Sequence, residues 1–267
     1  MANPTHSPTD TATESTDQAL RRRARRVVPG GMTGHLNAAA LPPGYPQFFQ
    51  RGDGCRLWDV DGRDVIDFMC AWGPNLLGYR HPEVEAAAQA QAALGDCLNG
   101  PTPRFVELAE TLVDTIAHAD WVLFQKNGTD ATTVALMVAR AATGRRKVLA
   151  AQGSYHGAAP WCTPVPAGTT PEDRAHLIRF RYNDVASLEA AAAEAGSDLA
   201  AVLLAPIRHD LGIDQAAPTP AFAQAARRLC TQAGAALVLG VQWLPLPPAM
   251  AAALPTGLQT VQLGLRP

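Results

Sequence analysis

The sequence contains very little lysine. Only Lys126 and Lys147 occur among its 267 residues, and arginine supplies the other basic side chains. The net charge of −2 and the isoelectric point near 6.4 exclude the strongly basic surface that is typical of nucleic-acid-binding proteins. No apolar run approaches the roughly 18–20 residues that a membrane-spanning helix needs. We therefore expect no nucleic-acid partner and no membrane segment.

Cysteine is also sparse, and its pattern excludes two kinds of stabilised fold. The five cysteines are scattered, odd in number and without a C-x-x-C pair. A disulfide framework or a structural zinc site needs closely and regularly spaced cysteines. We expect reduced thiols in a cytoplasmic protein, with no metal site.

Composition divides the chain into four parts. Residues 1–20 are rich in Thr, Ser, Asp and Pro, which is typical of a disordered tail. Residues 21–100 start with an arginine cluster, expected to be a solvated basic helix turn, and contain a β-hairpin. Residues 101–240 form an incomplete α/β domain. Residues 241–267 are Pro-rich with no charged residue before Arg266, a composition that fits a segment translated out of frame.

Short strand patterns alternate with helical ones through the body of the chain. The expected strands are 56–60 and 65–68, joined by the turn Asp61-Gly62, then 121–124, 147–150, 199–204 and 236–239. The expected helices are 83–94, 104–118, 130–143, 185–195 and 220–233. This alternation predicts an α/β fold with a mostly parallel sheet flanked by helices. A nicotinamide-binding fold would need G-x-G-x-x-G after a strand, which the sequence lacks.

The segment Asn127-Gly128-Thr129 is the first candidate site. It follows the expected strand 121–124, and Thr129 or Asp130 is expected to cap the next helix. Gly128 allows close approach of a ligand, the helix start attracts a phosphate, and Thr129 offers a hydroxyl donor. Taken alone, the same pattern also fits an ordinary strand–turn–helix connection that binds nothing.

The segment Tyr155-His156-Gly157 is the second candidate site. It follows the expected strand 147–150, at the carboxyl end where parallel sheets bind ligands. The flat ring of Tyr155 suits stacking on an aromatic cofactor. A plain surface turn is the alternative for this segment taken alone.

Together these motifs resemble the class III aminotransferases, particularly the branch containing glutamate-1-semialdehyde aminomutase. The resemblance is carried by F-x-x-N-G-T-D-A, A-x-x-x-T-G-R and S-Y-H-G, and earlier by P-G-G, D-x-D-G-R and L-G-x-x-H-P, over roughly residues 21–240. It implies a fold-type I enzyme that uses pyridoxal 5'-phosphate (PLP), forms a homodimer and acts on a small amine or amino acid. By motif match, Gly128 and Thr129 hold the phosphate beside Asn127, Tyr155 stacks on the pyridine ring, and His156 belongs to the same site.

Two groups that the resemblance implies for the chemistry are missing. The family places an aspartate for the pyridine nitrogen at the end of the strand 236–239, where this chain has Gly240, and no acidic residue follows Asp214. The Schiff-base lysine would follow a few tens of residues later, but no lysine follows Lys147. A further departure is Ala205, where most family members have Glu before the proline.

These departures leave two hypotheses for the function. The first is an aminotransferase or aminomutase that is truncated before its C-terminal small domain and is catalytically incomplete, so no catalytic residue is assigned. The alternative is a non-catalytic PLP-binding protein or a degenerate fragment. The sequence does not distinguish transamination from aminomutase chemistry.

Overall fold

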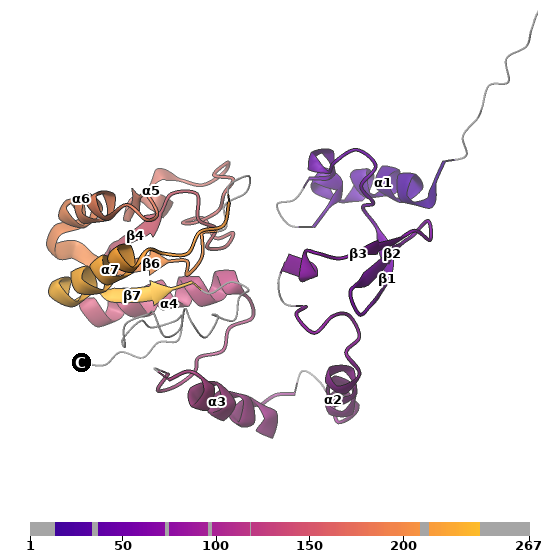
Figure 1. Cartoon of the computed structure of the whole chain (residues 1–267), viewed down its shortest axis with the longest axis horizontal. Helices are drawn as coiled ribbons and strands as arrows, with labels where there is room; N and C mark the ends of the chain where they lie inside the picture. The colour runs from indigo at the N-terminus through magenta and orange to yellow at the C-terminus, as the bar shows by residue number, and fades with distance from the viewer. Residues whose placement is uncertain are drawn as a thin grey trace, which may run out of the picture. The chain divides into compact units, whose positions relative to one another are not determined.

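The computed structural model describes residues 14–33, 37–72, 75–95, 98–117, 119–208 and 214–240. They belong to two compact units that divide between Asp96 and Cys97 (Figure 1). The tail expected at 241–267 lies outside the described residues, as does most of the tail expected at 1–20. Within the described parts, no helix is long and apolar enough to cross a membrane.

The first unit begins with helix α1 (Thr16–Val27), so residues 16–20, which were expected to belong to a disordered tail, are helical. Ser15 caps this helix. Its hydroxyl accepts a hydrogen bond from the Gln18 amide at 3.2 Å, and the Gln18 side chain accepts one from the Ser15 amide at 3.1 Å. This capping box satisfies two N–H groups at the helix start. The arginine cluster therefore lies on a 12-residue helix instead of a single turn.

An antiparallel three-stranded sheet, in the order β1-β2-β3, follows in the first unit. Its strands are β1 (Phe49–Asp53), β2 (Arg56–Asp59) and β3 (Asp64–Ile66), and the expected hairpin corresponds to β2 and β3. Strand β1 was not expected from the sequence, because its residues do not alternate between apolar and polar. It forms through backbone pairing with β2. The remaining elements are η1 (Pro29–Gly31), η2 (Ala38–Ala40), η3 (Cys70–Trp72) and α2 (Pro82–Ala93).

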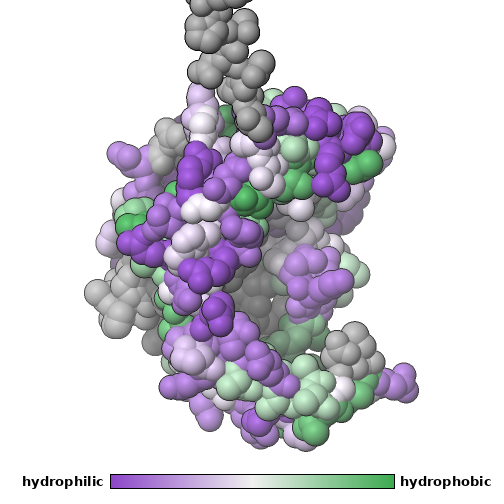
Figure 2. All heavy atoms as spheres, turned by 90° about the vertical axis from the view of Figure 1, so that its right-hand side faces the viewer, coloured by the Kyte–Doolittle hydropathy of each residue, from purple (hydrophilic) through white to green (hydrophobic). Residues whose placement is uncertain are grey.

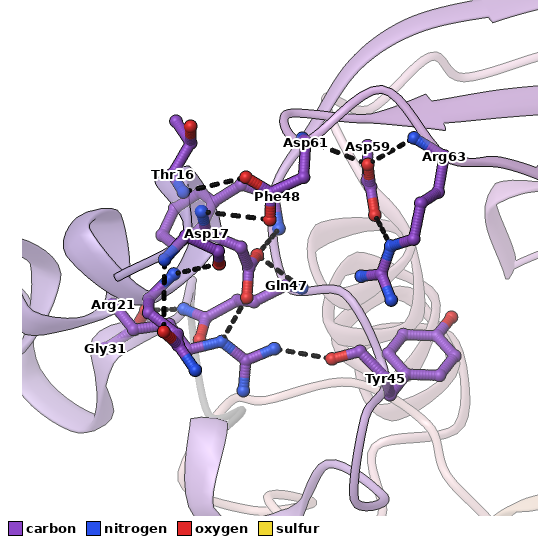
Figure 3. Close-up of polar contacts among 12 residues, drawn as sticks. Thr16, Asp17, Arg21, Gly31, Tyr45, Gln47, Phe48, Asp59, Asp61 and Arg63 are labelled. Carbon is purple, nitrogen blue, oxygen red and sulfur yellow. Dashed lines mark hydrogen bonds and ion pairs between the residues drawn. The ribbon is translucent and has the colours of Figure 1, made fainter. Parts of the chain in front are cut away.

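Asp17 joins α1 to the chain that leads into β1 (Figure 3). Its side chain is buried, and its carboxylate accepts hydrogen bonds from the amides of Gln47 at 2.9 Å and Phe48 at 3.0 Å. The same carboxylate accepts a hydrogen bond from Nε of Arg21 at 2.5 Å. Asp61, in the hairpin turn, accepts one from the amide of the first helical residue, Thr16, at 2.7 Å. These contacts fix α1 against the sheet.

We expect Asp17→Ala to loosen α1 selectively. Hydrogen bonds to a charged group contribute roughly 1.5–3 kcal/mol each, and leaving their partners unsatisfied adds to the loss. The amides of α1 should therefore exchange with solvent at least about 30-fold faster in native-state hydrogen exchange, which corresponds to about 2 kcal/mol. The control is Asp53→Ala, whose partner Arg80 is 3.6 Å away on the surface. Equal protection of α1 in both variants would contradict the role of Asp17.

The first unit also has an apolar groove on its surface. Figure 2 faces this unit and shows hydrophobic patches that interrupt a largely hydrophilic surface. The groove has a volume of about 710 Å³ and includes Tyr45, Phe49, Ile66 and Phe68 in its lining. The side chain of Phe68 is 90% exposed.

The second unit confirms the expected α/β fold with a parallel sheet flanked by helices. Its four strands pair in the order β5-β4-β6-β7, all parallel: β4 (Lys147–Ala151), β5 (Leu177–Phe180), β6 (Leu199–Leu204) and β7 (Ala236–Leu239). Its helices are α3 (Pro103–Thr115), α4 (Gly128–Thr143), α5 (Pro171–Arg174), α6 (Val185–Ala195), η4 (Gly196–Asp198) and α7 (Pro220–Ala233).

Helices cover both faces of this sheet. Leu149 of β4 packs in a core cluster with side chains from α6 and α7, whereas its neighbours Val148 and Ala150 pack with side chains from α4. Successive strand residues point to opposite faces, so the alternation places α6 and α7 on one side and α4 on the other. The strands are therefore buried on both faces, as their continuous apolar sequences require.

Two strand assignments from the sequence differ from the structure. The expected strand at 121–124 is not a strand; Phe124 lies against Phe105 of α3, with ring centroids 4.9 Å apart. A strand needs a neighbour for its backbone groups, and residues 121–124 pair with none of the four strands described in this sheet. Strand β5 was not expected from the sequence, because Arg179 interrupts its apolar run. In the structure, the Arg179 guanidinium donates to the carbonyl of Ala151 at 3.1 Å.

Candidate functional site

The candidate residues meet at the carboxyl edge of the parallel sheet. Helix α4 starts there with Gly128, and the loop 152–158 leaves the end of β4 on the same side. The Thr132 hydroxyl donates to the carbonyl oxygen of His156 at 2.8 Å. The Ala158 amide donates to Oγ1 of Thr129 at 3.1 Å. The two candidate motifs, far apart in the sequence, are therefore joined directly.

The start of α4 is capped by Asn127, not by Thr129 or Asp130 as the sequence predicted. The Asn127 side-chain oxygen accepts from the Asp130 amide at 2.9 Å, and its Nδ2 donates to the Asp130 carboxylate at 2.9 Å. In the described part of the chain, the amides of Gly128 and Thr129 have no hydrogen-bond acceptor. Because the helix dipole adds positive potential here, these two N–H groups form a place for an anion.

The loop after β4 presents side chains of different burial. Tyr155 is half-buried, whereas His156 is only 2% exposed. On its sheet side, His156 faces Gly240, the residue directly after β7. A Cβ atom built on Gly240 would lie 3.4 Å from Nδ1 of His156. The Gly240 amide donates to the carbonyl of Leu204 at 2.7 Å, which holds this position beside the end of β6.

Gly157 allows the loop to approach α4 closely. Its φ angle is +122°, and an added Cβ would lie 2.6 Å from Oγ1 and 2.9 Å from Cα of Thr129. Neither distance is compatible with a side chain, so only glycine fits without a shift of Thr129.

The comparison with known families decides the identity of the fold. The family model of the class III aminotransferases matches residues 40–240. The chain belongs to the class III aminotransferase family. The resemblance inferred from the sequence motifs is thereby confirmed.

Two curated relatives show the range of this class III aminotransferase family. The chain is 52% identical over 220 residues to the aminopentol aminotransferase of Sphingopyxis macrogoltabida, covering 82% of this chain and 52% of the relative. It is 36% identical over 236 residues to the glutamate-1-semialdehyde 2,1-aminomutase of Bordetella avium (strain 197N), covering 84% of this chain and 55% of the relative. The chain thus spans about half the length of these relatives.

Solved structures are similar to the chain over a comparable share of its length. The FumI protein of Sphingopyxis sp. MTA144, in its PLP internal aldimine form, has a TM-score of 0.81 at 51% identity, covering 84% of this chain and 54% of that one. An omega-transaminase from Sphaerobacter thermophilus has a TM-score of 0.77 at 29% identity, covering 84% of this chain and 54% of the other. The family and its PLP-bound members imply PLP as the cofactor.

The start of α4 in this class III chain fits the phosphate end of that cofactor. A phosphate group needs several donors, and the two amides of Gly128 and Thr129 supply a pair of them. The hydroxyl of Thr129 accepts from Ala158 and keeps its own proton to donate. The donor set is therefore suited to a dianion.

The two lysines of this chain differ in their distance from the carboxyl edge. Lys147 is the first residue of β4, four residues or about 13 Å from the carboxyl edge. Its ammonium donates to the carbonyl of Glu194 at 2.9 Å. Lys126 is exposed, directly before the cap of α4.

Ala205 stands where the sequence analysis noted a Glu in most family members. Its carbonyl accepts a hydrogen bond from the Tyr182 hydroxyl at 3.0 Å.

The described residues do not form a metal site or contain an activated cysteine. Among the described residues, no group of three His, Cys, Asp or Glu side chains could hold a metal ion. The four described cysteines are free. Burial raises the pKa of the Cys162 thiol, and burial raises that of Cys230 to about 12, so both stay protonated near neutral pH.

Thr132 belongs to the candidate site but was not identified from the sequence motifs. Its side chain is 3% exposed on the face of α4 that also carries Ala135, Leu136 and Ala139. In the sequence, Thr132 could have been recognised as the one hydroxyl residue on an otherwise apolar face of this helix. Buried hydroxyls are rarely left without a partner, so its position pointed to a polar contact with another segment.

Proposed function

We propose that this chain forms the phosphate-binding and ring-binding side of the PLP site of a class III aminotransferase or aminomutase. The observation that carries the proposal is that the amides of Gly128 and Thr129 have no acceptor in the described part of the chain, while the side chains of Thr129 and Thr132 are hydrogen-bonded to the loop 152–158. The whole protein's reaction would be amino transfer between two molecules, or amino-group migration within one, on a small amine or amino acid.

Each candidate residue then has a separate task. Gly128 and Thr129 would hold the phosphate through their amides and the Thr129 hydroxyl, while Asn127 fixes the turn by capping α4. Tyr155 would stack on the pyridine ring. His156, buried between the loop and Gly240, would keep water from that side of the ring. When bound, the cofactor supplies an electron-withdrawing ring that stabilises negative charge on the substrate carbon.

The described residues support cofactor binding more strongly than turnover. Covalent attachment and proton transfer in this family use a lysine, and the 267 residues contain none after Lys147. Position 240, expected to be the aspartate beside the pyridine nitrogen, is a glycine. We therefore propose that these residues bind PLP non-covalently. A homodimer and a cytoplasmic location are further proposals that rest on the family.

A titration with PLP and with pyridoxal, which lacks the phosphate, tests this proposal. We expect Thr129→Val to bind PLP at least about tenfold more weakly, because it loses a hydrogen bond to the charged phosphate and also the acceptor for the Ala158 amide, and to bind pyridoxal unchanged. The change is followed by cofactor absorbance. Thr169→Val is the control, since its hydroxyl donates to the carbonyl of Pro166 in a separate loop. If the unmodified chain binds PLP no better than pyridoxal, the phosphate assignment is wrong.

A further inference from the structure

We infer that Thr132 is a positioning residue that holds the phosphate-binding turn of α4 in register with the Tyr155-His156 loop. The inference rests on the proposed function, because it assigns to one buried hydroxyl the spacing between the two halves of the cofactor site. Thr132 itself would not touch the cofactor.

The contacts of the Thr132 hydroxyl reach both halves of the site. Its Oγ1 lies 3.0 Å from the carbonyl oxygens of Gly128 and Thr129. Bonds of this kind to the preceding helical turn are common for threonine in helices. The third and shortest contact, 2.8 Å to the carbonyl oxygen of His156, reaches a residue 24 positions away. That contact joins the helix to the loop.

A second hydrogen bond runs between the same two segments in the opposite direction. The Ala158 amide donates to Oγ1 of Thr129 at 3.1 Å. Gly157 lies between the two bonded loop residues, where the absence of a Cβ lets the backbone come close to Thr129. The loop is therefore held at two points on either side of Gly157. If the Thr132 contact is lost, the bond on the other side of Gly157 still depends on Thr129, a phosphate-binding residue.

The spacing matters because phosphate and ring are parts of one small ligand. PLP gains affinity from binding both groups only if the turn and the loop are already at the right distance. Since Thr132 is almost fully buried, its hydrogen bond to His156 is shielded from competing water. A loop freed from this bond would still accept a ring alone, but would no longer favour the ligand that carries both groups.

Three variants separate this role from a general effect on folding. Thr132→Val keeps the shape and removes the hydroxyl, whereas Thr132→Ser retains it. Thr143→Val is the matched control on the same helix, because the Thr143 hydroxyl donates to the carbonyl of Ala139 at 2.8 Å and not to the loop. We expect Thr132→Val to bind PLP about tenfold more weakly with unchanged affinity for pyridoxal. Thr132→Ser and Thr143→Val should bind both as the unmodified chain does.

A second measurement does not depend on the cofactor. In the cofactor-free protein, NMR-detected exchange of the Ala158 amide should be at least about tenfold faster in Thr132→Val than in Thr143→Val, because the loop opens more often. Equal exchange in these two variants overturns the inference. A lower melting temperature in Thr132→Val, without a change in the ratio of the PLP and pyridoxal affinities, also overturns it. If no variant prefers PLP over pyridoxal, the proposed function fails, while the Ala158 exchange still decides the role of Thr132.

Discussion

Gly157→Ala is expected to abolish PLP binding and to destabilise the second unit by about 3–4 kcal/mol. Alanine is strained at a φ of +122°, which costs roughly 1–3 kcal/mol. Its Cβ would also lie 2.6 Å from Oγ1 and 2.9 Å from Cα of Thr129. Relief of this overlap displaces Thr129, whose hydroxyl and amide belong to the proposed phosphate site. Chemical denaturation and PLP titration measure the two effects.

Gly168→Ala separates the backbone strain from the overlap. Gly168 has a φ of +84° with no atom within 4 Å of an added Cβ, so only the strain applies there. We expect a loss of about 1–2 kcal/mol and an unchanged affinity for PLP. Equal losses of stability in the two variants would mean that the close approach of Gly157 to Thr129 is not made in solution.

Phe222→Ala is expected to lower the free energy of unfolding of the second unit by about 3–5 kcal/mol. Phe222, on α7, is fully buried, and its ring centroid lies 6.1 Å from that of Phe180 and 5.3 Å from that of Tyr182. Removal of the ring leaves a cavity between α7 and the sheet. Because the Tyr182 hydroxyl donates to the carbonyl of Ala205, the cavity also loosens the end of β6.

The measurement for Phe222→Ala is urea-induced unfolding followed by circular dichroism. Met137→Ala is the control, because Met137 lies on α4 with 61% of its surface exposed. Its loss should stay within about 0.5 kcal/mol. A similar small loss for Phe222→Ala would show that the space between α7 and the sheet can collapse around the missing ring.

The fold of the second unit was largely predictable from its apolar patterns. The strands at 147–151, 199–204 and 236–239 are buried on both faces, so their apolar runs are long enough to be detected. The same pattern failed at 121–124, where the apolar run is present but a strand neighbour is not. Strand formation depends on a partner, and no local pattern encodes which partner is free.

The site was predictable only in part, for a related reason. The motifs around Gly128 and Tyr155 could be assigned because each follows an expected strand, and parallel strands end at one edge. The cap was assigned wrongly, since Asn127, Thr129 and Asp130 are all good capping residues and the choice depends on where the helix starts. The contact between Thr132 and His156 joins residues 24 positions apart, which no spacing rule reaches.

The order of the segments around the carboxyl edge has a consequence for synthesis on the ribosome. The start of α4 and the loop that ends at Ala158 are made first, whereas Gly240, which closes the site behind His156, follows about 80 residues later. At about 5–20 residues per second, roughly 4–16 s pass between the synthesis of this loop and that of Gly240. Capture of the cofactor is therefore expected only after β7 has left the exit tunnel, so the rate of translation sets the earliest time of loading.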